Sequence, residues 1–116
     1  MLTDLVSRAM TYDEALAARI RDLVSGEAGV TEQKMFGGLA FLVNGNMAVA
    51  ASGQGGILVR VDPAESDRLV ETTAAEEMVM RGRSMAGWLR LDPGEGELPE
   101  WVDRGLSYAR SLPPKR

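Results

Sequence analysis

Two arginines and a tryptophan are the side chains in this sequence best placed to bind a ligand. Arg60 lies in one expected strand, and Trp88 and Arg90 lie in another. Side chains alternate between the two faces of a strand, and all three of these residues fall on the same expected face of the sheet. A guanidinium beside an indole can bind an anion or a protein partner. The alternative is that the arginines are solvated, or paired with carboxylates at the surface.

Two other segments could contribute to binding. The first contains Lys34 and Phe36 followed by Gly37 and Gly38. This segment could form an edge that a ligand or a backbone approaches closely. The alternative is a strand with a glycine bulge. Arg83 and Met85 lie in a second expected hairpin, which could hold a phosphate or a partner, or be a charged surface turn beside a core methionine. The predicted binding residues are Lys34, Phe36, Gly37, Gly38, Arg60, Arg83, Met85 and Trp88.

The composition excludes most kinds of catalytic chemistry. The chain has no His and no Cys, which removes thiolate nucleophiles, disulfides, imidazole bases and the commonest zinc ligands. An enzyme would have to use carboxylates, Lys34, Tyr12 or Tyr108, and their spacing shows no nucleophile–base pair. We therefore expect no enzymatic activity, no metal and no cofactor.

The charge and hydropathy pattern indicates where the protein works. Thirteen basic and 17 acidic residues give a formal charge of −4, so no basic field attracts nucleic acid or anionic lipid. No apolar run reaches the length of about 18 residues that a membrane span needs. The first ten residues lack the basic start and long apolar centre of a signal peptide. We expect a cytoplasmic protein that binds neither nucleic acid nor membrane directly.

Residues 34–61 are the stretch around which the rest of the chain is organised, and they predict three consecutive antiparallel strands. Asn44 and Gly45 lie between two apolar runs, and both tolerate the positive φ angles of a type I′ turn. With this pair as the turn, Leu42 is expected opposite Met47, Phe41 opposite Ala48, and Ala40 opposite Val49.

Both faces of this predicted hairpin are apolar. The expected faces are Leu39, Phe41, Val43, Ala48 and Ala50 on one side, and Ala40, Leu42, Met47, Val49 and Ala51 on the other. One layer of helices covers only one of them, so the second face must meet a ligand, another protein layer or another copy of the chain.

Three helices are expected around the strands. The first spans residues 12–25 and begins with a capping box formed by Thr11 and Glu14; the second begins at Asp62 and Pro63 and ends near residue 71 or 72; the third spans residues 99–111. A second hairpin is expected from residues 77–80 and 85–91 across the tip at 81–84. In it Met85, Gly87, Leu89 and Leu91 face one way, and Ala86, Trp88 and Arg90 face the other.

These elements predict an α+β fold: a two-layer α/β domain with an antiparallel sheet, in the order α-β-β-β-α-β-β-α. At 116 residues the chain is long enough for one domain. We expect residues 1–10 to form an N-terminal extension or short helix, residues 11–112 to form the domain, and residues 113–116 to be a disordered tail.

Several short motifs together resemble the N-terminal domain of the TfoX/Sxy family of bacterial competence regulators, over residues 10–112. They are Tyr12-Asp13-Glu14, Lys34-Met35-Phe36-Gly37-Gly38, Phe41 with Asn44-Gly45-Asn46-Met47, Leu58-Val59-Arg60-Val61, and Arg83-Ser84-Met85 before Trp88. The resemblance implies a secretion-chaperone-like two-layer fold without an established active site. Full-length members carry a further helical domain and act with a transcription factor, so this chain would be a standalone copy of the first domain.

The leading hypothesis is thus a non-catalytic interaction or regulatory domain. It would form a homodimer through the second sheet face or a sheet edge, or bind another protein partner, and could be linked to transcriptional regulation through protein–protein contacts. The alternative is a small-molecule (anion) sensor, or a small enzyme, with its pocket on the second face. In that case Arg60 would anchor the anion and Trp88 would form a wall.

Overall fold

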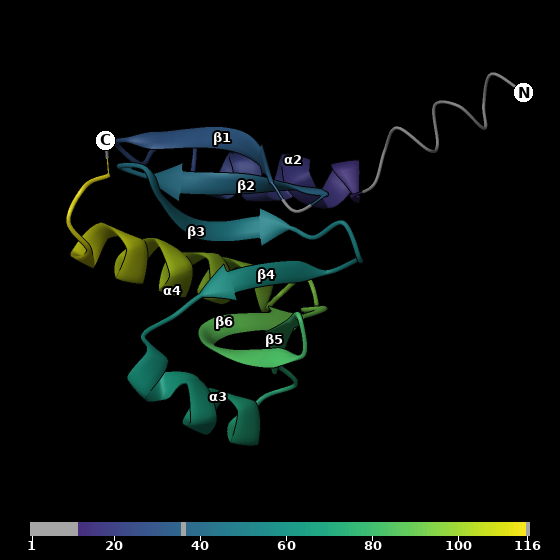
Figure 1. The fold of residues 1–116 in the computed structure, drawn as a ribbon. Coiled ribbons are helices and arrows are strands. Elements are labelled where there is room, and N and C mark those ends of the chain that lie inside the picture. Colours follow the sequence, from purple (N-terminus) through teal and green to yellow (C-terminus); the bar gives the residue numbers. More distant parts are fainter. Residues whose placement is uncertain (1–11, 36, 116) are drawn as a thin grey trace, which may run out of the picture.

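The computed structural model describes residues 12–35 and 37–115. Within them, three α-helices and a short 3₁₀ helix accompany a six-stranded antiparallel sheet, whose strand order is β1-β2-β3-β4-β6-β5 (Figure 1). The elements along the chain are α2 (Glu14–Leu23), β1 (Val30–Met35), β2 (Gly38–Val43), β3 (Asn46–Ala51), β4 (Ile57–Arg60), η1 (Pro63–Glu65), α3 (Ser66–Thr72), β5 (Glu76–Met80), β6 (Arg83–Leu91) and α4 (Leu98–Ser111).

The predicted α+β class and the predicted order of helices and strands are confirmed. The first group of strands also contains β1, which pairs along its whole length with β2 from Val30↔Val43 to Met35↔Gly38. Its central residues, from Thr31 to Lys34, are polar and exposed. An edge strand with few apolar side chains shows no alternation of apolar and polar residues. The apolar pattern that predicts a strand therefore begins only near the end of β1, at residue 34.

The hairpin of β2 and β3 turns at Asn44 and Gly45, as predicted, with φ angles of 52° and 85°. Leu42 pairs with Met47 as expected. Beyond that pair the predicted register is wrong: Phe41 lies opposite Val49, and Ala40 opposite Ala50.

A β-bulge between Phe41 and Leu42 causes this difference. Because Ala48 is the extra residue on β3, Ala48 and Val49 both belong to the main core, and every later residue of β3 changes face. Ala51 therefore joins the core, while Ala50 lies on the second face. A bulge leaves no mark in an all-apolar strand, since either register buries similar side chains.

The main core lies between the sheet and the helices. Phe41, Val49 and Val59 of the sheet, Ile20 of α2 and Leu106 of α4 are buried there. In Figure 1, α2 and α4 lie behind the sheet, and α3 lies beside β5 and β6. All three helices contribute to this one core, which leaves the opposite side of the sheet without a helical layer among the described residues.

Helix starts follow local capping chemistry. The backbone N–H of Leu16 donates to Asp13 Oδ1 at 3.1 Å, so Asp13 caps α2 in place of the predicted Thr11, which lies outside the described residues. The helix ends at Leu23, two residues before the predicted end. Asp62 accepts from the N–H of Ala64 at 2.9 Å and starts the η1–α3 segment at Pro63, as predicted.

The C-terminal residues up to 115 are attached to the domain, contrary to the expected disordered tail. The N–H of Lys115 donates to the carbonyl of Asn44 at 2.8 Å, and Nδ2 of the buried Asn46 donates to the carbonyl of Pro113 at 2.9 Å. The chain after α4 is therefore held against the β2–β3 turn. The expected N-terminal extension at residues 1–10 lies outside the described residues.

Candidate functional site

The sheet surface opposite the helices, here called the helix-free face, is the candidate functional site. Its centre is a second apolar cluster formed by Ala40, Leu42, Met47, Ala50 and Leu58. These residues come from β2, β3 and β4, so the middle of the sheet is apolar on both sides. The two-sided apolar character that the sequence predicts is thus present.

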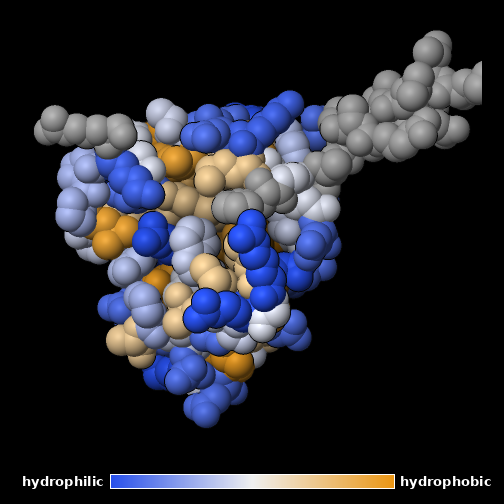
Figure 2. Space-filling view, viewed as in Figure 1, coloured by the Kyte–Doolittle hydropathy of each residue, from blue (hydrophilic) through white to orange (hydrophobic). Residues whose placement is uncertain are grey.

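Long side chains at the margins of the sheet shield this cluster. Met35 of β1, Met78 of β5 and Trp88 of β6 pack against it and are half-buried. As a result Leu42 is only 8% exposed. Figure 2 shows the outcome: tan and orange apolar residues gather in the middle of the face, and blue hydrophilic residues surround them. An apolar centre with a polar rim is the usual composition of a protein-binding surface.

A cavity of about 320 Å³ opens at one end of the helix-free face, beside the loop between β3 and β4. Its apolar lining includes Ala50, Leu58, Met35 and Met78. The other residues around it are Gly38, Ala51, Ser52, Gly53, Gln54, Glu76, Glu77, Val79 and Arg90.

Arg90 is the cationic group of this cavity. It is half-buried, lies opposite Glu76 of β5 and Leu58 of β4, and forms no ion pair with any residue that the structure describes. Glu76 lines the same cavity and lies opposite Arg90, whereas the carboxylate of Glu77 accepts a hydrogen bond from Ser66 Oγ of α3 on the helix side. A cavity with one cation and one carboxylate suits a small molecule that carries both signs of charge better than a simple anion.

Arg60 and Trp88 lie together on the helix-free face, as predicted, but they do not line the cavity. The Cζ atom of Arg60 lies 5.0 Å from the centre of the Trp88 ring and 5.7 Å from that of Tyr108 in α4. The guanidinium is thus in contact with two aromatic rings, a cation–π arrangement that fixes the end of β4. The sequence predicted Trp88 as a neighbour of Arg60 but gave no sign of Tyr108, because the contact between Arg60 and Tyr108 depends on how α4 crosses the sheet.

The predicted binding residues between Lys34 and Gly38 do not share one face of the sheet. Lys34 lies opposite Leu39, whose side chain is in the main core, so Lys34 is on the helix side. Gly37 forms the β1–β2 turn with a φ of 76°, and Phe36 lies outside the described residues. Gly38 lines the cavity, and a Cβ there would overlap the carbonyl of Ala51.

Arg83 and Met85 lie at the start of β6. The hairpin turns at Arg81 and Gly82, with φ angles of 55° and 78°, so Arg83 already pairs with Met80. Met85 lies opposite Met78 and shares the helix-free face with it.

We expected Met85 on the same side as Leu89, and this expectation is wrong. The register shifts between Glu77 and Met78, where Gly87 has a φ of 87° on the opposite strand. This irregularity inverts the alternation of side chains between Leu89 and Met85.

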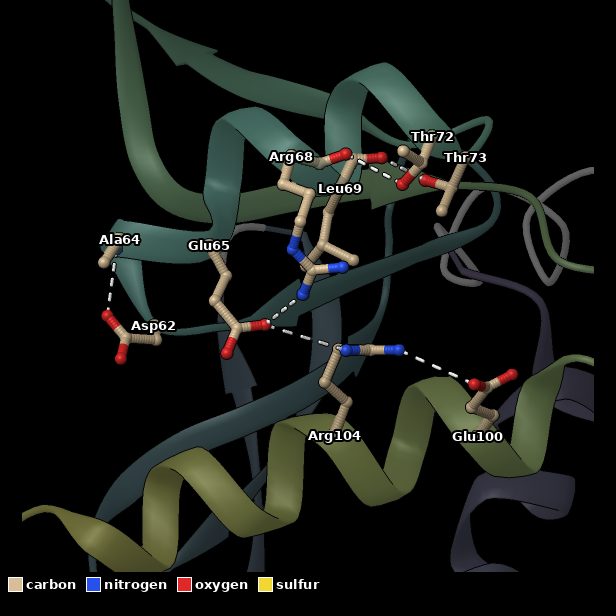
Figure 3. A network of polar contacts seen from close by, with 9 residues as sticks. All are labelled: Asp62, Ala64, Glu65, Arg68, Leu69, Thr72, Thr73, Glu100 and Arg104. Carbon is tan, nitrogen blue, oxygen red and sulfur yellow. Dashed lines mark hydrogen bonds and ion pairs between the residues drawn. The ribbon is translucent and has the colours of Figure 1, made fainter.

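The helix side carries a network of ion pairs that joins α3 to α4 (Figure 3). Glu65 accepts from Arg68 at 2.9 Å, and Arg104 lies 3.9 Å from Glu65 and 3.6 Å from Glu100. Arg104, with 31% of its side chain exposed, also lies 5.2 Å from the Trp101 ring centre. These partly exposed groups neutralise one another, so we assign them a structural role.

No group of three or more His, Cys, Asp and Glu side chains within 12–35 and 37–115 is arranged to hold a metal ion. None of the described helices is long and apolar enough to cross a membrane.

Comparison with known proteins supplies the family. No curated protein and no solved structure matched the chain. The family model of the TfoX N-terminal domain matches residues 22–109. This range runs from the end of α2 through all six strands to α4, and so includes the whole helix-free face. The chain therefore belongs to the TfoX N-terminal domain family.

Proposed function

We propose that this chain is a non-catalytic interaction domain with a regulatory role. It forms a homodimer, and it contacts a protein partner through the helix-free face. The observation that carries the proposal is the apolar centre of that face, which no described helix covers. Membership of the TfoX N-terminal domain family fits a regulatory or interaction domain.

The side chains of the face support this reading. Met35, Met47 and Met78 are flexible and polarisable, so they can repack against partners of different shape. Trp88 beside them is the residue type that most often contributes strongly to protein interfaces. The chain has neither His nor Cys, which favours binding over catalysis.

The regulatory role would act through protein–protein contacts in the cytoplasm. A formal charge of −4 disfavours direct binding to DNA phosphates. We therefore propose that any link to transcription passes through a partner protein.

Two matched substitutions on β1 test the face. Met35→Glu introduces a charge on the rim of the helix-free face, and Lys34→Gln changes the net charge by the same amount on the helix side. Each variant serves as bait for partner capture, and circular dichroism verifies that both are folded.

We expect wild type and Lys34→Gln to capture the same partner, and Met35→Glu to lose it. A wild-type protein that sediments as a monomer at every concentration and captures nothing through this face would contradict the proposal. Equal capture by folded Met35→Glu and Lys34→Gln would contradict the assignment of the face.

The cavity favours a second candidate function, a small-molecule sensor. Its volume of about 320 Å³ suits a small metabolite, and the half-buried Arg90 has no carboxylate partner among the described residues. A thermal-shift screen with free amino acids and small carboxylates tests it, because a ligand that binds only the folded state raises the melting temperature. Any shift should be lost in Arg90→Met and kept in Arg83→Met, whose arginine lies outside the cavity.

A further inference from the structure

The two edges of the sheet have opposite character. At the β1 edge, Thr31, Glu32, Gln33 and Lys34 are all exposed and polar. Charged side chains of this kind discourage pairing with another strand. The β5 edge instead presents Met78, Val79 and Met80, and Val79 is 62% exposed.

The backbone of β5 has unused hydrogen-bonding groups at its centre. Met80 and Arg83 flank the two-residue turn of the β5–β6 hairpin, so they exchange both backbone hydrogen bonds with each other. Because these groups alternate in direction along a strand, those of Val79 point away from β6. β6 is the only neighbour of β5 in the described sheet (Figure 1), so the outer edge at Val79 is open.

We propose that β5 pairs antiparallel with β5 of a second copy of this chain, with the two-fold axis at Val79. The proposal rests on the proposed function and names the surface that forms the homodimer. The two sheets would join into one, with helices on one side and both helix-free faces on the other. Val79 is exposed enough to show that α3 does not cover the middle of this edge.

The register follows from charge and apolar character. An axis at Val79 places Val79 opposite its own copy and Met78 opposite Met80, and it brings Glu77 next to Arg81, the first turn residue after β5. Opposed residues then share a face, and the symmetry repeats the Glu77–Arg81 pair. Glu77 is available for it, because only its Oε2 accepts a described hydrogen bond, from Ser66 Oγ at 2.9 Å.

Neighbouring registers are poorer. An axis at Met78 would place Val79 opposite Glu77, and an axis at Met80 would place Val79 opposite Arg81, so each sets an apolar side chain against a charged one. An axis at Glu77 or Arg81 would bring like charges together. The interface is short, since β5 has five residues, so we expect a weak dimer that forms at high concentration.

Sedimentation velocity from about 1 µM to about 1 mM measures the dimer. Val79→Glu places two carboxylates against each other at the axis and should raise the dissociation constant by about tenfold or more. The matched control is Leu23→Glu on α2, which changes a large apolar residue that is also exposed, to 40%, and should leave the dissociation constant unchanged.

A charge exchange tests the register. Arg81→Glu opposes Glu77 with a carboxylate and should weaken the dimer about tenfold. Adding Glu77→Arg to that variant restores the opposite pairing and should recover the dimer, whereas Arg83→Glu, with the same change in net charge outside the predicted pair, should have no effect.

The outcomes separate this inference from the proposed function. A dimer that survives Val79→Glu but is broken by Met35→Glu would overturn the β5 edge and leave the interaction function standing. A wild type that stays monomeric to the highest concentration would also overturn the edge pairing, while Met35-dependent capture of a partner would still support the proposed function.

Discussion

Replacing Gly105 with alanine tests how α4 is held against the sheet, and the structure and helix propensity predict opposite results. Gly105 lies in the middle of α4 and is buried. In a helix interior, Gly→Ala ordinarily stabilises a protein by about 1 kcal/mol, because alanine loses less backbone entropy on folding. Propensity alone therefore predicts a more stable variant.

The packing at Gly105 predicts the reverse. A Cβ there would overlap the carbonyl oxygen of Ala48 in β3, and would lie 3.1 Å from the carbonyl carbon and 3.3 Å from Val59 Cγ1. The carbonyl belongs to the bulged strand in the middle of the sheet and cannot rotate away as a side chain would. Overpacking of this kind costs about 1–3 kcal/mol. Subtracting the propensity gain of about 1 kcal/mol leaves a net loss of about 0–2 kcal/mol in the free energy of unfolding. Because the clash is with backbone, we expect the upper half of that range, about 1–2 kcal/mol.

Urea and thermal unfolding, followed by circular dichroism, measure this loss. For a domain of this size, about 1 kcal/mol corresponds to a melting temperature about 4 °C lower. Gly26→Ala is the control, because a Cβ at Gly26 meets no atom within 4 Å and its φ is not in the left-handed region. We expect the control to be unchanged, or up to about 1 kcal/mol more stable. A Gly105→Ala protein as stable as wild type would refute the close approach of α4 to β3.

Three further predictions concern local contacts. Two hydrogen bonds from Arg21 lower the pKa of Glu32 below 4.5, so their contribution to stability is complete above that pH and is lost as the pH falls below it. The difference in melting temperature between wild type and Glu32→Gln should accordingly shrink in acid, and a difference independent of pH would contradict the ion pair. Asp62→Ala removes the cap of η1 and should cost about 1 kcal/mol in urea unfolding, whereas Asp62→Asn should retain most of it. Asn46→Ala removes the hydrogen bond to Pro113 and should increase amide exchange at Lys115; unchanged exchange would mean that this bond does not hold the C-terminal residues.

The candidate site was predictable in character and only partly in its residues. The continuous apolar runs on both sides of Asn44-Gly45 indicated a second apolar face, and the position of Arg60 beside Trp88 followed from counting along the strands. The cavity and the exposed edge at Val79 were not predictable, because they depend on which strands become neighbours. β4 pairs with β6 and not with β5, and this order brings Arg90 to the cavity while leaving β5 at the edge.

By itself, the sequence determined the features that depend on a few adjacent residues. The Asn44-Gly45 turn follows from the φ angles that these residues tolerate, and the start of the η1–α3 segment follows from Asp62 and Pro63. Only the tertiary structure decided the bulge at Ala48, the side of the sheet on which Met85 lies and the anchoring of the C-terminal residues. The C-terminal anchor joins Asn46 to Pro113, which lie far apart in the chain. The other two features lie within hairpins of consecutive strands, where an apolar residue satisfies either face equally well until packing against the rest of the domain selects one.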